Sequence, residues 1–458
     1  MKNTIKVVLS FVYISLSQDI YTNYVIENSD TLDVFSYQIP SGYLNSNKHP
    51  ILVAFHQWGG NQNSPYSTSF DEECELRNWI FLSPFGGSTN NYNHQEAQRY
   101  TEIALLYLIE NYSIDQDRIY MVGGSMGGAS GAIYANNHLN PKSPMVAATA
   151  SASGILDCER RYYEMDGNNS MTEWFGGSPI EVPFEYHRNS AIFFADLNNS
   201  MHYNLQYTPI YLDFGSTEPH RYHAEDLYSI LQGYNNNMWI DINPNPGHGF
   251  SVIDEFHSCD WLSNFVLERN PDNIRVNLDE PSRAYWLEAI NQVNTNDFIN
   301  IDCRKCYQNA YCINQFNNSD TLIFHILDDT INSEIEFHNN QEAPMITIGV
   351  TGESPLISTI SNIEFNNLTN NSLSNNLIHQ DTIIYVNISP GIFSMSLFVE
   401  TDTNQDGIWN ILDITILTGF IIENFYPSEV EYINSDINQD GILDILDVII
   451  IINLILEN

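Results

Sequence analysis

The chain has 458 residues, more than one ordinary domain, and enough apolar content for a sizeable core. Its 16 Lys and Arg residues stand against 57 Asp and Glu residues, which gives a formal net charge of −41. Such an excess of carboxylates repels phosphate groups, so the composition argues against nucleic acid or an anionic membrane as a partner. It is compatible with high solubility, cation binding or life in a salty medium.

The N-terminus has the pattern of an export signal. Two lysines flank the start of an apolar stretch from Val7 to Leu16, and small residues follow up to Ser17. This stretch is too short to span a bilayer, as is the apolar run near the C-terminus, so no membrane anchor is expected. We predict a cleaved signal peptide over residues 1–17 and a secreted protein, extracellular or periplasmic.

Six cysteines fit an exported protein with up to three disulfides, although the sequence alone does not pair them. Cys303 and Cys306 have a spacing that could also bind zinc, but no fourth ligand is evident nearby. Export therefore favours disulfides over a metal here.

Residues 18–270 alternate short β-rich runs with longer amphipathic ones. This alternation predicts a mostly parallel sheet with helices on both faces, and chemistry at the carboxyl ends of its strands. The predicted strands are residues 49–56, 78–85, 117–124, 208–215 and 238–244, and the predicted helices are residues 94–112 and 223–234.

The segment GGSMG, residues 123–127, places Ser125 between glycines after an apolar strand and before a helix-forming stretch. GxSxG in that context is the pattern of a nucleophile elbow, in which small neighbours allow a tight strand-to-helix turn. A glycine-rich loop is the alternative, but the strand before it and the helix after it favour the elbow. Ser125 is therefore the predicted nucleophile.

A serine hydroxyl needs a base and an acid to orient that base. His248 lies in a glycine-flanked loop after the last strong strand, which favours it over His56, because His56 precedes the serine. Between Ser125 and His248, Glu218 falls in the turn beyond a strand, whereas Asp213 belongs to that strand. We predict Glu218 as the acid and keep Asp213 as the alternative.

The tetrahedral oxyanion needs two N–H donors. One is the backbone N–H of Met126, directly after the nucleophile. The other is expected from the loop HQWGG, where Gln57 or Trp58 would donate its backbone N–H.

Four segments in this order, HQWGG, DRIYMVGGSMGG, FGSTEP and GHGF, resemble the α/β-hydrolase superfamily, in particular secreted esterases of the polyhydroxybutyrate-depolymerase-like and feruloyl-esterase-like groups. Phe214 stands where the family usually has histidine, and Glu218 replaces the commoner aspartate. The resemblance implies hydrolysis of carboxylic esters through an acyl-enzyme, with no cofactor for catalysis. We also interpret residues 155–205 as a loop-rich cap over the acyl pocket, where Trp58 and Trp174 could stack on the substrate or instead pack in the core.

After Asn270 the chain changes to Asn, Ser, Thr and Asp with alternating strands, which predicts a small all-β module over residues 271–398. The last part, residues 399–458, contains a repeat whose second copy begins at Asp436, 34 residues after Asp402.

Both copies place oxygen ligands at the spacing of an EF-hand loop, with aspartate in place of glutamate at position 12. The predicted ligands of two calcium ions are Asp402, Asn404, Asp406, Ile408 (backbone carbonyl), Asn410 and Asp413, then Asp436, Asn438, Asp440, Ile442 (backbone carbonyl), Asp444 and Asp447.

Two such loops, each followed by an apolar helix, resemble the dockerin family. The resemblance implies a calcium-binding α-helical module and a cohesin-like protein as partner through residues 399–458. Ile411, Leu412, Ile445 and Leu446 are apolar where the family often has a Ser-Thr-like pair. They could contact a partner or pack the two helices together, so a purely structural module stays open.

The sequence therefore predicts a secreted serine esterase for esters linked to polysaccharides or for polyesters. Two alternatives remain: a serine peptidase of the prolyl-oligopeptidase type, although its usual propeller is not evident, and a non-catalytic scaffold-binding protein.

Overall fold

The computed structural model describes residues 19–457 apart from several short segments, namely 168–169, 245–246, 308, 327–333, 342–344, 353–359, 369–371, 374–377, 381–382, 400–402, 405–409, 429–430, 433–434 and 437–440. The predicted signal peptide lies outside the described residues. Contacts between Cα atoms divide the chain into two compact units. The first unit comprises Met1–Tyr134, Val146–Ser178 and Thr208–Leu267, and the second comprises Ala135–Met145, Pro179–Tyr207 and Glu268–Asn458.

The first unit is built on one mixed sheet. Its strands are β1 Tyr21–Glu27, β2 Asp30–Gln38, β3 His49–Phe55, β4 Ile80–Pro84, β5 Ile114–Gly124, β6 Ala148–Ala152, β7 Ile210–Gly215 and β8 Met238–Asn243, in the spatial order β1-β2-β4-β3-β5-β6-β7-β8. The strands from β3 to β8 run parallel, and β2 is antiparallel to both β1 and β4. The predicted mostly parallel sheet is confirmed, with an antiparallel hairpin at one edge.

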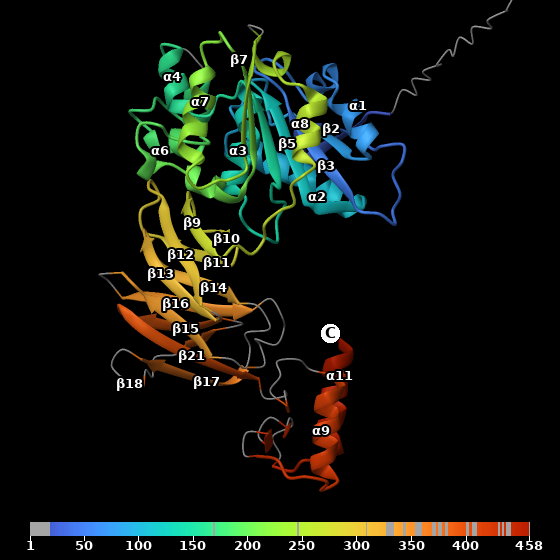
Figure 1. The fold of residues 1–458 in the computed structure, drawn as a ribbon, viewed down its shortest axis with the longest axis vertical. Coiled ribbons are helices and arrows are strands. Elements are labelled where there is room, and N and C mark those ends of the chain that lie inside the picture. The colour runs from blue at the N-terminus through green and yellow to red at the C-terminus, as the bar shows by residue number, and fades with distance from the viewer. Residues whose placement is uncertain are drawn as a thin grey trace, which may run out of the picture. The chain divides into compact units, whose positions relative to one another are not determined.

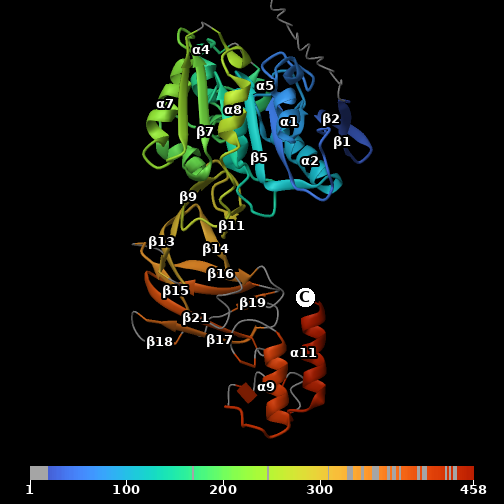
Figure 2. The same ribbon diagram turned by 45° about the vertical axis from the view of Figure 1, so that its right-hand side comes forward.

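Helices lie on both faces of this sheet (Figures 1 and 2). Helices α1, Phe70–Arg77, and α8, Glu255–Leu262, share a buried cluster with Leu52 and Ala54 of β3. The alternate residues Ile51 and Val53 are just as buried, and side chains alternate along a strand, so a second layer must cover the opposite face. Helix α2, Gln95–Asn111, contacts β4 and β5 outside that cluster and supplies part of this layer.

The second unit contains two β-sheets made from thirteen strands, counted over the described residues. The strands are β9 Asn273–Leu278, β10 Arg283–Ala284, β11 Leu287–Gln292, β12 Ile299–Tyr307, β13 Ala310–Asn317, β14 Ser319–Ile326, β15 Glu334–Asn339, β16 Ile346–Gly352, β17 Ile360–Asn367, β18 Ser372–Leu373, β19 Ile378–Gln380, β20 Ile383–Ile388 and β21 Gly391–Val399. Phe324 of one sheet lies 5.3 Å from Tyr311 and 5.0 Å from Phe337 of the other, measured between ring centroids. Buried aromatic contacts thus join the two sheets face to face.

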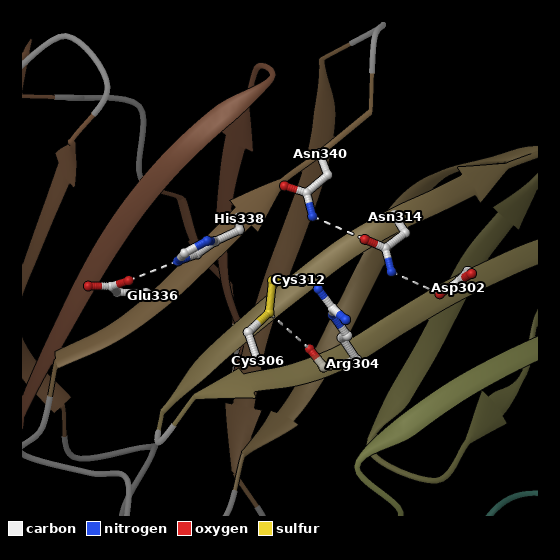
Figure 3. Close-up of a disulfide and its surroundings, with 8 residues drawn as sticks. All are labelled: Asp302, Arg304, Cys306, Cys312, Asn314, Glu336, His338 and Asn340. Atoms are coloured by element: carbon white, nitrogen blue, oxygen red, sulfur yellow. Dashed lines mark hydrogen bonds and ion pairs between the residues drawn. A yellow bond between two sulfur atoms is a disulfide. The ribbon is translucent and has the colours of Figure 1, made fainter.

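The cysteines do not form three disulfides. Cys306 and Cys312 are bonded across the β12–β13 hairpin, as Figure 3 shows. The four remaining cysteines are buried and form no disulfide: Cys74, Cys158, Cys259 and Cys303. Residues three apart on a strand point to opposite faces, so the CxxC spacing does not bring the thiols of Cys303 and Cys306 together. Cys303 is buried in the sheet, while Cys306 forms its disulfide with Cys312.

Residues 155–205 do not form one cap. The part up to Ser178 belongs to the first unit, whereas Pro179–Tyr207 belongs to the second. Within the second unit, Arg188 donates from Nε to Asp279 over 2.8 Å, and Asn204 and Asn277 exchange two hydrogen bonds of 2.9 Å. The sequence does not reveal this division, because it depends on hydrogen bonds between residues 179–207 and the β-rich region, which are far apart in the chain.

The C-terminal residues form two packed helices, α9 Ile411–Ile421 and α11 Ile445–Glu457, seen side by side in Figure 2. Leu417 of α9 packs with Val448 and Ile451 of α11. The described residues contain no helix long and apolar enough to cross a membrane.

Replacing Leu52 by alanine is expected to lower the free energy of unfolding by about 2–5 kcal/mol, because it leaves a cavity between the sheet and helices α1 and α8. Leu76→Ala is the matched control, since Leu76 is 76% exposed on α1 and should change stability by less than about 0.5 kcal/mol. Urea unfolding monitored by tryptophan fluorescence measures both. Equal effects of the two substitutions would contradict this description of the core.

Candidate active site

The segment around Ser125 is a tight turn between strand β5 and helix α3, Met126–Asn137. Ser125 has a φ of +56°, which lies in the left-handed region that residues other than glycine rarely adopt. Its backbone N–H donates to Ala152 of β6 over 2.8 Å, and its carbonyl accepts from Gly128 and Ile155. These three bonds hold the strained residue in place, and the turn is the elbow that the sequence predicts.

Gly123 and Gly127 explain why the turn needs glycine. A Cβ on Gly123 would lie 2.0 Å from the carbonyl oxygen of Gly127, and a Cβ on Gly127 would lie 2.5 Å from the carbonyl oxygen of His56. Both contacts are with backbone atoms that cannot yield cheaply. The glycines are therefore required by close approach of the strand, the helix and the β3 loop, while the left-handed conformation falls on the serine itself.

Ser125, His248 and Glu218 form a continuous hydrogen-bonded chain. The Nε2 atom of His248 lies 2.7 Å from Oγ of Ser125, and its Nδ1 atom lies 2.9 Å from Oε2 of Glu218. The His248 side chain is 42% exposed, whereas that of Glu218 is 2% exposed. A buried carboxylate thus hydrogen-bonds to one ring nitrogen of His248, and the other ring nitrogen faces the hydroxyl of the predicted nucleophile.

Asp213, the alternative acid, lies within strand β7. It is buried, and burial first, followed by repulsion from Asp241, raises the pKa of its carboxyl to about 7. An acid with a raised pKa is a poorer partner for an imidazolium than an ionised one. The described geometry therefore pairs His248 with Glu218, which follows the end of β7.

The predicted oxyanion donors lie at the start of α3 and in the loop after β3. Met126 is the first residue of α3, where the N–H has no partner within the helix. Gln57 and Trp58 follow β3, and Trp58 and Met126 line one pocket with Ser125. In addition, the Gln57 side chain accepts a hydrogen bond from the N–H of Phe250 over 3.2 Å, which ties this loop to the histidine loop.

His56 supports the same loop. Its two ring nitrogens lie 2.8 Å from the backbone carbonyl oxygens of Gln57 and Phe85, and the residue is 2% exposed. The ring is thus held by the backbone around it, as expected for a structural histidine rather than a second base.

The pocket at Ser125 has a volume of about 180 Å³ and is lined by Trp58, Tyr92, Ser125, Met126, Ile155, Arg161 and Met165. Sequence reasoning missed Tyr92 and Arg161, because no motif marks them. Trp174, for which the sequence left substrate stacking and core packing open, stacks on His94 with 4.5 Å between ring centroids. The part of the predicted cap that reaches this pocket is therefore Ile155, Arg161 and Met165.

A second pocket of about 440 Å³ shares the Trp58 wall. Its lining is largely polar and includes Ser64, Thr68 and Glu255. Trp58 is 58% exposed and lines both pockets.

The C-terminal repeats are only partly described. Asp402, Asp406, Ile408, Asn438 and Asp440 lie outside the described residues. Within the part that is described, no group of three or more His, Cys, Asp or Glu side chains lies close enough together to hold a metal ion.

The described positions of the two repeats nevertheless match each other. Asp413 and Asp447 are fully buried and accept the backbone N–H groups of Asn410 and Asp444, each over 2.9 Å. In the second loop Asp436 accepts the N–H of Gly441, whose φ is +78°. Two carboxylates are thus held inside the loops at equivalent places.

Comparison with protein families gives a match that spans the candidate site. Residues 90–265 match the prolyl oligopeptidase family, a range that contains Ser125, Glu218 and His248. A comparison with curated proteins finds no match.

Among solved structures, a ferulic acid esterase is 14% identical, covers 54% of this chain and 96% of its own, and has a TM-score of 0.40. A fluorophosphonate-binding serine hydrolase of Staphylococcus aureus is 13% identical, with coverages of 54% and 98% and a TM-score of 0.40. An acylaminoacyl peptidase of Pyrococcus horikoshii is 16% identical, with coverages of 54% and 40% and a TM-score of 0.41.

If Glu218 orients His248, Glu218→Gln should lower kcat for 4-nitrophenyl acetate by about 10⁴-fold, because an amide favours the wrong tautomer of the imidazole. Asp213→Asn is the control, since it removes a neighbouring acid that does not bond to His248, and it should keep kcat within a few-fold of the parent. Steady-state kinetics measure both, and the reverse ranking would transfer the acid role to Asp213.

The strand order, the elbow and the hydrogen-bonded chain at the carboxyl ends of the strands are those of an α/β-hydrolase domain with the site of a serine hydrolase.

Proposed function

We propose that the protein is a secreted serine esterase that hydrolyses carboxylic esters linked to polysaccharides or in polyesters. The observation that carries the catalytic part is the chain of hydrogen bonds from Ser125 through His248 to Glu218. The export signal, which lies outside the described residues, and the dockerin-like repeat support secretion and a polysaccharide context.

In the proposed mechanism, Oγ of Ser125 attacks the ester carbonyl while Nε2 of His248 takes its proton. Glu218 holds the imidazole by Nδ1 and stabilises its charged form. The N–H of Met126, with that of Gln57 or Trp58, stabilises the negative charge on the carbonyl oxygen. His248 then gives the proton to the leaving alcohol, and water releases the acid by the same steps in reverse.

The two pockets that Trp58 lines support distinct places for the two halves of an ester. The pocket that contains Ser125 has mostly apolar walls and, at about 180 Å³, lies below the ~300–1,000 Å³ typical of sites for drug-sized ligands, so it suits a small acyl group. The polar pocket of about 440 Å³ suits the larger alcohol half, because its hydroxyl and carboxylate groups can hydrogen-bond to a sugar.

The match to the prolyl oligopeptidase family keeps a peptidase as the second candidate. Both reactions use the same triad, so only turnover of matched substrates separates them.

Ser125→Ala should lower kcat/KM for 4-nitrophenyl acetate by at least about 10⁴-fold and abolish labelling by a fluorophosphonate probe. Ser130→Ala, in the same helix, is the control and should retain both. The parent should hydrolyse 4-nitrophenyl acetate much faster than the amide with the same acyl group, 4-nitroacetanilide. Comparable turnover of the anilide would favour the peptidase, and an unlabelled parent would favour the non-catalytic alternative.

The C-terminal repeats are proposed to bind two calcium ions. Buried carboxylates are costly unless paired with hydrogen bonds or a cation, and Asp413 and Asp447 are buried at equivalent loop positions. The ions would join loops to helices and take no part in ester hydrolysis.

A protein partner for this module, such as a cohesin-like protein, is a further proposal. Ile411, Leu412, Ile445 and Leu446 are each at least 50% exposed, so they do not pack the two helices together. These apolar side chains are exposed at equivalent positions of both repeats, which supports a role in binding a partner.

Calorimetric titration of the full chain with calcium should give two ions per molecule. Asp413→Asn and Asp447→Asn should each remove about one ion, because an amide replaces the charged ligand at position 12. Glu423→Gln, an exposed acid between the repeats, is the control and should leave two. A parent chain that binds no calcium would contradict the proposal.

A further inference from the structure

The pocket at Ser125 contains a cation in a protein that has few. Arg161 of helix α4, Cys158–Glu164, is one of 16 Lys and Arg residues in a chain of net charge −41. It lines the same pocket as Ser125, and the other wall residues, Trp58, Tyr92, Met126, Ile155 and Met165, are uncharged. Placing a guanidinium among uncharged side chains has a desolvation cost. Packing alone does not account for a cation at this position.

The contacts of Arg161 hold it but do not use all its donors. Nη1 lies 3.2 Å from Oε2 of Glu164 and 3.1 Å from a ring nitrogen of His220. Its side chain is 19% exposed, and Nε is buried with no hydrogen-bond partner among the described residues. A guanidinium has five N–H donors, and these two contacts involve Nη1 alone.

Glu164 is shared among several cationic or titratable groups. Its Oε2 also lies 3.2 Å from Nδ1 of His220, and its Oε1 lies 3.4 Å from Nε2 of His223. Burial raises the pKa of Glu164, but hydrogen bonds from His220 and His223 and the charge nearby outweigh it and hold that pKa well below its usual range. The two oxygens of one ionised carboxylate are therefore divided among Arg161, His220 and His223.

Tyr92 lies beside the same guanidinium. The residue is buried, and burial raises the pKa of its hydroxyl while Arg161 opposes that rise. The phenol thus stays protonated and donates to Sδ of Met165 over 3.7 Å, and Tyr92 and Arg161 line the same pocket. Together these groups match a carboxylate, which accepts hydrogen bonds in a planar, two-oxygen geometry.

We propose that Arg161 makes this esterase select acyl groups that carry a second, ionised carboxylate, as in the monoesters of short dicarboxylic acids. The inference rests on the proposed ester hydrolysis at Ser125. The volume of about 180 Å³ restricts the acyl chain to a few carbons between the ester and the carboxylate.

The test compares substrates that differ only in charge. Monoethyl glutarate carries the carboxylate, and ethyl glutaramate replaces it by an amide of the same size. Released ethanol is measured in about 0.15 M salt, where the screening length of about 8 Å limits repulsion by the acidic surface. Succinate and adipate homologues of both esters set the chain length.

The parent is expected to favour monoethyl glutarate, or the succinate homologue, by about 10-fold or more in kcat/KM, the effect of one charge-assisted hydrogen bond. Arg161→Gln should remove this preference by lowering kcat/KM for monoethyl glutarate by about 10-fold more than that for the amide ester. Glu164→Gln, which removes the competing anion but keeps the guanidinium, should retain or increase the preference.

Arg161 could instead merely clamp the turn that carries His220 and, two residues earlier, Glu218. In that case Arg161→Gln and Glu164→Gln would lower turnover of both esters by the same factor, which would overturn the proposal. Equal kcat/KM for the two esters in the parent would also overturn it.

A further arm locates the charge. Acetoxyacetate and acetoxyacetamide place the carboxylate or the amide on the alcohol half, and acetate release is measured. A preference that depends on Arg161 in this pair alone would contradict the assignment to the acyl side. If the parent did not hydrolyse neutral esters at all, the proposed esterase activity would be refuted. Hydrolysis of both esters without a charge preference would refute only the role of Arg161.

Discussion

The strained backbone of Ser125 is the constraint on which the rest of the hydrolase unit depends. A residue with a side chain in the left-handed conformation is unfavourable by about 1 kcal/mol or more, so surrounding structure must hold it there. The backbone hydrogen bonds of Ser125 with Ala152, Gly128 and Ile155, and the absence of Cβ atoms at Gly123 and Gly127, meet this need. The result is a hydroxyl lifted above the carboxyl end of β5, where loops from neighbouring strands can reach it.

Because β3, β5, β7 and β8 are parallel strands of one sheet, their carboxyl ends lie at the same edge. The turn after β7 brings Glu218, and the loop after β8 brings His248, to the serine. The side chain of Gln57 joins the loop after β3 to the histidine loop. Because these hydrogen bonds connect the loops, a displacement of one loop would also displace the others.

The C-terminal module reuses one local device twice. Asn410 with Asp413, and Asp444 with Asp447, cap helices α9 and α11 by the same pair of hydrogen bonds. The acid at position 12 thus has a role in starting the helix as well as in the proposed cation site. Buried hydroxyls of Thr403 and Ser435, 3.3 Å apart, connect the two repeats.

The sequence alone was enough to predict the sheet, the elbow and the three residues of the hydrogen-bonded chain, because each depends on local periodicity, glycine spacing or chain order. It did not reveal strand β6, since Ala148–Ala152 is made of small residues without a β-branched run, and only its central place in the sheet makes it a strand. It could not pair the cysteines, divide residues 155–205 between two units or place Arg161 and Tyr92 beside Ser125. Those features depend on contacts between residues far apart in the chain, which only tertiary packing decides.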